Sequence, residues 1–185
     1  MPNRWEMPPL YLQSGDPEAE NVPTMAYPGQ LGCRITVKQP GPPGVPGAED
    51  YRDKRYQYVQ TDSTMSVAPY KGAVAWWANK TRYLVTTSVT ALGRDRIAGV
   101  FQNAITPGYY GCIQIGGPAT TKFVDAVTAA PTAAGLIVIP SATDGKADCL
   151  AAGTAATYPA LGLSASAYNA VDCTAIVDLD VPETT

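Results

Sequence analysis

Residues 173–181 read Cys-Thr-Ala-Ile-Val-Asp-Leu-Asp-Val, and this stretch gives the clearest indication of the fold. Its last three apolar residues, Val177, Leu179 and Val181, alternate with two aspartates. A period of two is typical of a β-strand with one side facing a core and the other facing water. We therefore expect a strand here whose valine and leucine side chains are buried and whose carboxylates are solvated.

Short segments of the same kind, rich in Val, Ile and Thr, recur along most of the chain. Turn-forming residues separate them, as at Thr106-Pro107-Gly108, Gly116-Gly117-Pro118 and Asp144-Gly145. So many short strands predict an all-β fold, namely a compact sandwich or barrel of short antiparallel strands. Strands are predicted at 33–37, 83–91, 97–104, 110–116, 123–128, 135–139, 146–152 and 173–181, with a solvated strand and turn at 49–58.

The composition agrees with this prediction. The chain has 185 residues, enough for one domain that buries about 70% of its unfolded-chain surface. Apolar residues make up 45% of the sequence, so a core can form, and the 17 glycines and 17 prolines disfavour long helices. We predict one β globular domain over residues 31–185 and a segment of different character before it.

That segment, residues 1–30, contains six prolines with large apolar side chains between them. Each proline fixes its own backbone and pushes the preceding residue toward an extended conformation. We expect an extended Pro-rich N-terminal arm, which would span on the order of 100 Å if fully stretched. A Pro/Gly-rich stretch lies at 40–48, and three Gly-x-y triplets can be read from Gly41 onward. Because three are too few for a triple helix, we expect a stiff loop there, the alternative being contact at a threefold axis.

Trp76 and Trp77 are adjacent in the sequence. Consecutive strand residues point to opposite faces, so one indole is expected in the core and the other at the surface or in an interface. We assign Trp77 to an interface with a partner.

The charge pattern limits the classes of partner. The net charge of −3 is too acidic for a general electrostatic grip on nucleic acid. Up to residue 96, eleven Lys and Arg face nine Asp and Glu, whereas beyond it two face seven, so the C-terminal part carries about −5. No run approaches the roughly 18 apolar residues of a membrane helix, and the first residues lack the apolar core of a signal peptide. We expect a protein folded in the cytosol, without a nucleic-acid or membrane partner.

The sequence offers no recognisable catalytic constellation. Histidine, the commonest general base and metal ligand, is absent, and no Gly-x-Ser-x-Gly or phosphate-binding loop motif occurs. Cys33, Cys112, Cys149 and Cys173 form no C-x-x-C pair and are expected to be free buried thiols, with two disulfides or a four-thiolate zinc site as alternatives. We predict no catalytic, cofactor-binding or metal-binding residues and no enzymatic activity, although a glycosidase acid pair can come from anywhere in a β fold.

Residues 97–119 read Ile-Ala-Gly-Val-Phe-Gln-Asn-Ala-Ile-Thr-Pro-Gly-Tyr-Tyr-Gly-Cys-Ile-Gln-Ile-Gly-Gly-Pro-Ala. This stretch resembles a hairpin of tailed-bacteriophage head proteins, in which Gly-Val-Ala/Phe-Gln leads through a Gly-containing turn to Tyr-Gly-x-x-Gln-x-x-Gly. Leu161-Gly162-Leu163 and Val177-Asp178-Leu179-Asp180 are similar to the way these small β domains end. The resemblance runs from Ile97 onward and is to the capsid decoration, or cement, proteins.

The resemblance implies a structural virion protein, assembled in the host cytoplasm, that binds the outside of a phage head and clamps neighbouring major-capsid subunits. It also implies a homo-oligomer, with a trimer favoured. An arm would add contact area on more than one subunit, and its removal with residues 1–28 is expected to abolish capsid binding while the globule stays folded. The residues expected to contact the capsid are Trp5, Leu10, Tyr11, Leu12, Met25, Tyr27 and Trp77.

A head-fibre or tail-associated carbohydrate-binding module is the alternative function. Such a module needs aromatic side chains exposed on the globule, and only Trp76, Trp77 and the tyrosines of residues 51–58 are candidates for that role. Their exposure therefore separates the two functions.

Overall fold

The computed structural model of the chain describes residues 12–25, 30–38, 53–89, 97–124, 131, 134–150 and 159–181. These residues contain no helix and form ten strands that join in one sheet, so the all-β prediction is confirmed. The predicted loop at 40–48 lies outside the described residues. The strands are β1 (Arg34–Val37), β2 (Lys54–Thr61), β3 (Val74–Asn79), β4 (Leu84–Thr86), β5 (Ile97–Phe101), β6 (Tyr110–Lys122), β7 (Ile137–Pro140), β8 (Ala147–Cys149), β9 (Gly162–Ser164) and β10 (Thr174–Asp180).

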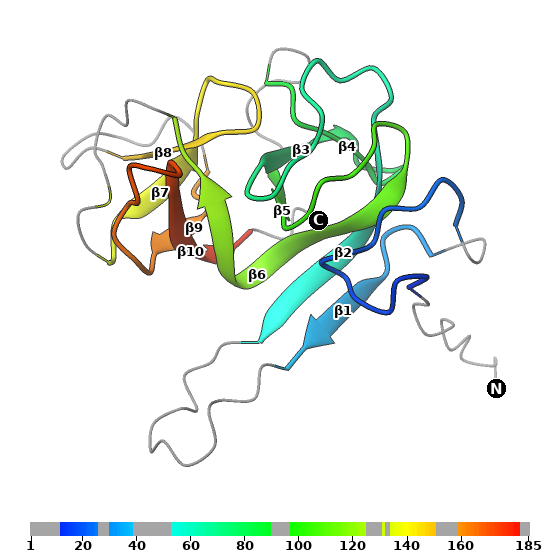
Figure 1. Cartoon of the computed structure of the whole chain (residues 1–185), viewed down its shortest axis with the longest axis horizontal. Coiled ribbons are helices and arrows are strands. Elements are labelled where there is room, and N and C mark those ends of the chain that lie inside the picture. The colour runs from blue at the N-terminus through cyan, green and yellow to red at the C-terminus, as the bar shows by residue number, and fades with distance from the viewer. Residues whose placement is uncertain are drawn as a thin grey trace.

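Five of the strands close into a barrel (Figure 1). Their order around the ring is β2-β4-β3-β5-β6, and β6 returns to pair with β2. Neighbouring strands in the ring run antiparallel except β2 and β4, which run parallel. Closure gives the ring a single interior, filled by side chains such as Val59, Phe101 and Ile113, which are fully buried.

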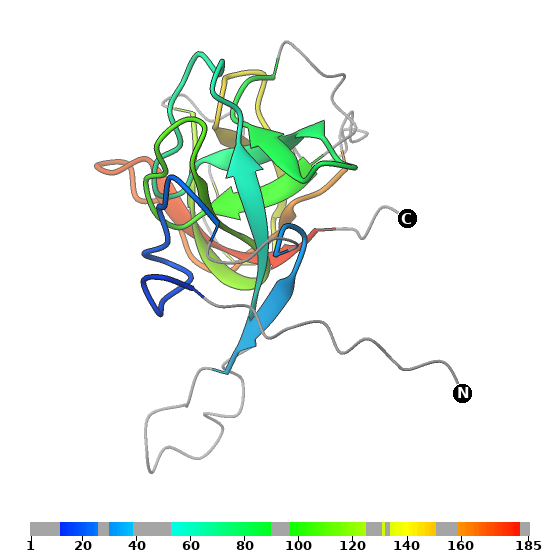
Figure 2. The same ribbon diagram turned by 90° about the vertical axis from the view of Figure 1, so that its right-hand side faces the viewer.

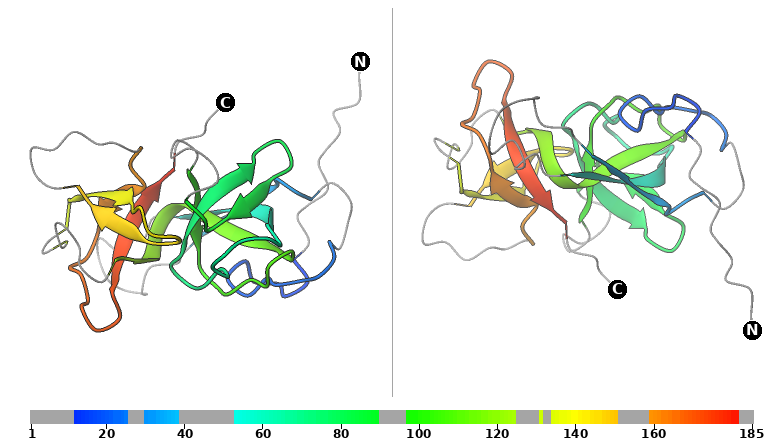
Figure 3. Two further views of the ribbon diagram at one scale, coloured as in Figure 1. Left: turned by 90° about the horizontal axis from the view of Figure 1, so that it is seen from above. Right: turned by 90° about the horizontal axis from the view of Figure 1, so that it is seen from below.

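Strand β1 pairs with β2 outside the ring, and the other four strands form a second layer, the C-terminal sheet, which continues from β6 in the order β6-β10-β9-β7-β8. Strand β6 is 13 residues long and belongs to both parts, because it pairs with β2 over residues 110–116 and with β10 over residues 116–122. Figure 3 shows the C-terminal strands gathered on one side of the barrel. The two parts therefore share a strand and, as the buried residues show, a core.

The change of partner along β6 occurs at Gly116-Gly117-Pro118, where the sequence pattern predicted a turn. That prediction is wrong, because these residues lie inside a continuous strand. On the barrel side, Arg55 pairs with Gly116 and Tyr56 with Gln114, so Ile115 is an extra residue relative to β2. Such a bulge bends a strand and increases its twist. The bulge directs β6 out of the barrel and into the C-terminal sheet.

Two further strand boundaries differ from the predicted ones. The strand expected at 83–91 is limited to β4, because the backbone N–H of Val89 is bonded to the Asp144 carboxylate instead of a neighbouring strand. The strand expected at 123–128 is reduced to a parallel bridge between Phe123 and Ala147 within the described residues. Both differences arise from side-chain and tertiary contacts, which cannot be predicted from the strand propensity of the residues.

The alternation predicted for the last strand is confirmed. Val177, Leu179 and Val181 are buried, Asp180 is exposed and Asp178 is half-buried. The three apolar side chains belong to the same core cluster as the barrel interior. One hydrophobic core therefore holds the C-terminal sheet against the barrel.

The two tryptophans do not divide between core and surface as expected. Trp76 is 2% and Trp77 5% exposed, and both belong to the main core. Trp77 packs edge-on against Tyr83, in the turn between β3 and β4, with 6.1 Å between the ring centroids. The turn that contains Tyr83 thus covers the side of β3 that alternation alone would leave at the surface. Trp77 is therefore not exposed for a partner.

Residues 12–25 do not form an extended arm. They fold into turns that pack against the outside of the barrel beside β2 and β6 (Figure 2). Val22 and Tyr110 exchange backbone hydrogen bonds of 3.0 and 2.9 Å, and Leu12 and Met25 pack on a second apolar cluster of Tyr56, Tyr58 and Cys112. Proline content predicted an extended arm for this segment, and the cluster that its turns cover is built by residues far along the chain.

A buried carboxylate organises this segment internally. Glu20 is fully buried and accepts hydrogen bonds from Gln13 N at 3.0 Å, Ser14 N at 2.9 Å and Ser14 Oγ at 2.6 Å. The carbonyl oxygen of Glu20 accepts a further bond of 3.0 Å from Asn103 Nδ2 on the barrel. A buried carboxylate is tolerated when donors satisfy it in this way. The segment is thus an integral part of the folded domain.

A second carboxylate ties the segment to β2. Glu18 Oε1 accepts a hydrogen bond from Lys54 Nζ at 2.7 Å and one from the Tyr56 hydroxyl at 2.5 Å. Burial alone would raise the pKa of Glu18, but these bonds and the charges of Lys54 and Lys71 outweigh it and leave that pKa below its ordinary value. Glu18 is therefore ionised when the segment is docked at neutral pH.

The four cysteines are free thiols. Cys112 and Cys149 are buried as expected, whereas Cys33 and Cys173 are only half-buried. Burial, with a smaller contribution from the Asp148 charge, raises the pKa of Cys149 to about 11, and burial likewise raises the pKa of Cys112. The two buried thiols are therefore protonated and act as small apolar side chains.

Candidate interaction surface

The C-terminal sheet has two faces of opposite character. Inward-facing residues, such as Ala119, Val138 and Ala175, are buried in the common core. The alternate residues point the other way and form what we call the outer face. It consists of Pro118, Thr120 and Lys122 on β6, Thr174, Ile176, Asp178 and Asp180 on β10, Leu163 on β9, Ile137 and Ile139 on β7, and Asp148 on β8.

Exposed apolar side chains are concentrated on this face. The large apolar residues exposed in the described part of the chain are Leu163 (50%), Ile137 (41%), Ile176 (38%) and Val171 (90%). The first three lie on the outer face, and Val171 lies at the tip of the loop between β9 and β10. Ile137 pairs with Leu163, which in turn pairs with Asp178, so the aliphatic pair adjoins a carboxylate row. Grouped exposed apolar residues are typical of an interaction site.

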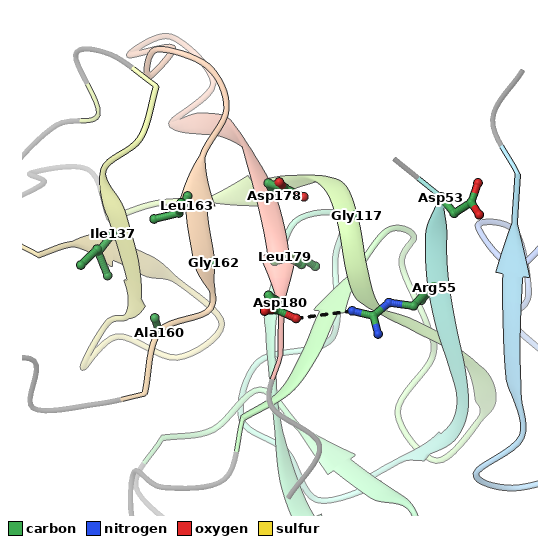
Figure 4. A pocket seen from close by; sticks show the side chains of 10 residues that line it. All are labelled: Asp53, Arg55, Gly117, Ile137, Ala160, Gly162, Leu163, Asp178, Leu179 and Asp180. Carbon is green, nitrogen blue, oxygen red and sulfur yellow. Dashed lines mark hydrogen bonds and ion pairs between the residues drawn. The ribbon is translucent and has the colours of Figure 1, made fainter. Parts of the chain in front are cut away.

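A groove of about 610 Å³ lies where the outer face meets the start of β2 (Figure 4). Ile137 and Leu163 lie together on one side of it, and Arg55 points toward Asp180 on the other. The side chain of Asp53 points away from this pair. The lining residues are Asp53, Arg55, Gly117, Ile137, Ala160, Gly162, Leu163, Asp178, Leu179 and Asp180.

Arg55 and Asp180 meet across a glycine. Gly116 is the register partner of Arg55 on β2 and of Asp180 on β10. A Cβ atom at position 116 would lie 2.3 Å from Nε of Arg55, so the guanidinium lies directly over the glycine backbone. Its Nη2 is 3.5 Å from Oδ1 of Asp180, and the two side chains are 43% and 91% exposed. The ion pair is therefore well solvated and weak, and the carboxylate stays accessible.

Two glycines give the groove a floor of bare backbone. A Cβ atom at position 162 would lie 2.0 Å from the carbonyl oxygen of Asp178, and one at position 117 would lie 2.5 Å from the carbonyl oxygen of Asp53. Both positions therefore need glycine for the strands to approach this closely. Both glycines line the groove, so part of its floor is backbone.

The structure does not bring the predicted partner-binding residues together on the surface. Leu12 and Met25 are half-buried against the second apolar cluster, and Trp77 is in the core. Trp5, Leu10, Tyr11 and Tyr27 lie outside the described residues. The exposed apolar residues are instead those of the outer face.

The sequence does contain a pattern that indicates the outer face, but the prediction based on alternating apolar residues did not consider it. Residues 136–139 read Leu-Ile-Val-Ile and residues 175–177 read Ala-Ile-Val, so both strands carry apolar side chains on consecutive positions. Consecutive residues of a strand point to opposite faces. Such runs indicate either a strand buried on both faces or, as here, an exposed apolar face.

Within the described ranges, the chemistry of other site classes is not assembled. No group of three or more His, Cys, Asp or Glu side chains is positioned to hold a metal ion. Nor does this part of the chain contain a helix with the length and hydrophobicity needed to span a bilayer. The outer face with its groove is the strongest candidate for a functional surface.

Comparison of the chain with protein-family models, with curated proteins and with solved structures finds no match.

Proposed function

We propose that the protein is a structural virion component that binds the outside of a phage head and clamps neighbouring major-capsid subunits. The observation that carries the proposal is the outer face, where Ile137, Leu163 and Ile176 are exposed on one rigid sheet beside Asp178 and Asp180. A decoration protein needs a preformed contact surface and no active site.

The hairpin on which the resemblance rests provides a second line of support. Strands β5 and β6 are antiparallel neighbours, with Val100 opposite Gln114 and Phe101 opposite Ile113. The expected hairpin is therefore formed, and its second strand continues into the outer face at Pro118. Membership of the decoration-protein family remains a prediction of the sequence resemblance.

The carbohydrate-binding alternative loses its best candidates. Trp76, Trp77, Tyr56 and Tyr58 are each at most 5% exposed, so none offers a ring face to a sugar. Tyr51 lies outside the described residues. Among the described residues, no aromatic side chain lines the groove. We therefore favour a protein partner.

The structure changes the design of the deletion that tests the arm. Removing residues 1–28 would also remove Leu12, Glu20 and Met25, which pack on the barrel, so a loss of capsid binding would be confounded by unfolding. Removing residues 1–11 leaves the docked segment intact. Equal melting temperatures for this variant and the full chain are the control for correct folding.

The test is co-sedimentation of the purified full chain with heads of the phage that encodes it, followed by electron microscopy. We expect saturable binding to the head exterior, lower occupancy after deletion of residues 1–11, and a trimer in solution by light scattering. Recovery of the protein on tails, or with no part of the particle, would refute the proposal.

A further inference from the structure

We propose that the outer face binds an extended polypeptide segment that turns one face toward the groove, with branched aliphatic residues at one end of that face and a Lys or Arg at the other. The inference rests on the proposed function in one respect only: if that function holds, the segment belongs to the major capsid protein. The chemistry of the segment follows from the groove itself.

The aliphatic requirement comes from β7 and β9. Ile137 and Leu163 are register partners, lie side by side in the groove and are 41% and 50% exposed. Covering these side chains with an apolar group removes them from water at little entropic cost, because the strands already hold them in place. A branched aliphatic side chain of the partner fits between them.

The cationic requirement comes from β10. Asp178 and Asp180 project from the outer face, and the Asp180 side chain is 91% exposed although it pairs with Arg55. The other charged groups on this face are Lys122 at its far end and Asp148 on β8, so carboxylates predominate. Arg55 is held over Gly116 and engages one oxygen of Asp180 at 3.5 Å, which leaves the carboxylate able to accept a bond from a second cation.

The length of the segment follows from the strand order. From Ile137 to Arg55 the groove crosses β7, β9, β10, β6 and β2, which are four strand spacings or about 19 Å. An extended chain covers this distance with about six residues. Gly117 and Gly162 line the groove with backbone alone, so no side chain of theirs stands between the sheet and the partner. A short extended peptide therefore matches the groove in length and charge.

The first experiment measures binding of a fluorescein-labelled peptide, Val-Ser-Val-Ser-Lys-Ser, to the full-length protein by fluorescence anisotropy; its two Val and its Lys lie on one face when it is extended. Two matched peptides carry Glu in place of Lys or Ser in place of Val. We expect measurable binding of the Lys/Val peptide alone, weakened by added salt because exposed charges contribute to it.

Variants of the protein locate the site. We expect Asp180→Asn to weaken binding of the Lys/Val peptide about three- to tenfold and Leu163→Ser to weaken it about tenfold or more. The control is Val171→Ser, which removes a 90% exposed apolar side chain outside the groove and should leave the affinity unchanged. Equal affinity for the Glu peptide, or no effect of either groove variant, would overturn the inference, as would absence of binding up to about 1 mM peptide.

The second experiment separates this inference from the proposed function. The same three variants are co-sedimented with phage heads. If the wild type binds heads and Leu163→Ser and Asp180→Asn bind them equally well, the inference fails and the proposed function stands. If the peptide binds the groove but the wild type does not bind heads, the proposed function fails and the groove has another partner of the same chemistry.

Discussion

In the barrel, every large apolar side chain that the structure describes is buried or half-buried, whereas the C-terminal sheet leaves Ile137, Leu163 and Ile176 exposed. The two regions share β6 and one core, so the difference does not come from separate domains. It comes from closure. A ring of strands has one interior, and residues 12–25 cover part of its outside, but an open layer has two faces and only one meets the barrel. Stability should therefore reside in the barrel, and binding on the outer face.

The largest expected effect comes from opening the barrel interior. Phe101 on β5 is fully buried in the main core. Replacing it with Ala should lower the free energy of unfolding by about 3–5 kcal/mol, because the lost contacts leave a cavity. Urea denaturation followed by tryptophan fluorescence measures this loss, since Trp76 and Trp77 belong to the same core. A loss below about 1 kcal/mol would mean that the barrel is not the main source of stability.

The next largest effect comes from Gly162, the first residue of β9, which pairs with Leu179 on β10. In the Gly162→Ala variant the new methyl group meets the Asp178 carbonyl oxygen, so the two strands must separate, at an expected loss of about 1–3 kcal/mol. Gly116→Ala is the matched control, next to Gly117 of the groove lining. There the methyl group meets the flexible Arg55 side chain, whose exposed ion pair is worth at most about 1 kcal/mol. Equal losses in thermal denaturation would contradict this distinction.

A smaller effect concerns the docked N-terminal segment and depends on pH. The folded-state pKa of Glu18 lies below its ordinary value of 4.5, so its stabilisation is present above that value and is lost as the pH falls through the folded-state pKa. The wild type should lose about 1–2 kcal/mol more than Glu18→Gln between neutral and acid pH, through the bonds to Lys54 and Tyr56. Urea denaturation across this range checks it, and parallel curves for the two proteins would exclude the role of Glu18.

The smallest effect sharpens the contrast between the two faces of the C-terminal sheet. Leu163 and Val177 lie on adjacent strands, one on the outer and one on the inner face. Leu163→Ala should change stability by no more than about 0.5 kcal/mol, whereas Val177→Ala should lose about 2 kcal/mol. Calorimetry of both variants tests this. A large loss for Leu163→Ala would show that the outer face supports the fold and is not reserved for a partner.

Local patterns predicted the fold class and the clearest strand because a period of two is a property of the segment itself. Val177 and Leu179 are buried as alternation required, and the free thiol of Cys149 behaves as a small apolar group. Strand partners are not local. Gly116-Gly117-Pro118 carries every feature of a turn, yet these residues lie in β6 because their missing side chains admit Arg55 and the Asp53 carbonyl.

The N-terminal segment shows the same limit from another direction. Its prolines and apolar residues predicted an extended arm, and nothing in residues 12–25 reveals that Tyr56, Tyr58 and Cys112 form a patch for Leu12 and Met25. Glu20 is an acidic residue and would be expected at the surface from its residue type alone. Its carboxylate can be buried because backbone N–H groups of the same turn donate hydrogen bonds to it. Contacts between distant segments decided both outcomes.

The position of β10 affects how the chain completes its fold as it leaves the ribosome. Strands β2 to β6 are contiguous in the sequence, so the ring can close while the rest is still being translated. In contrast, β10 follows the other nine described strands in the sequence but lies between β6 and β9 in the sheet. Completion of this sheet therefore waits for β10 to be inserted, and a premature stop codon before residue 174 would remove the strand that joins β9 to β6.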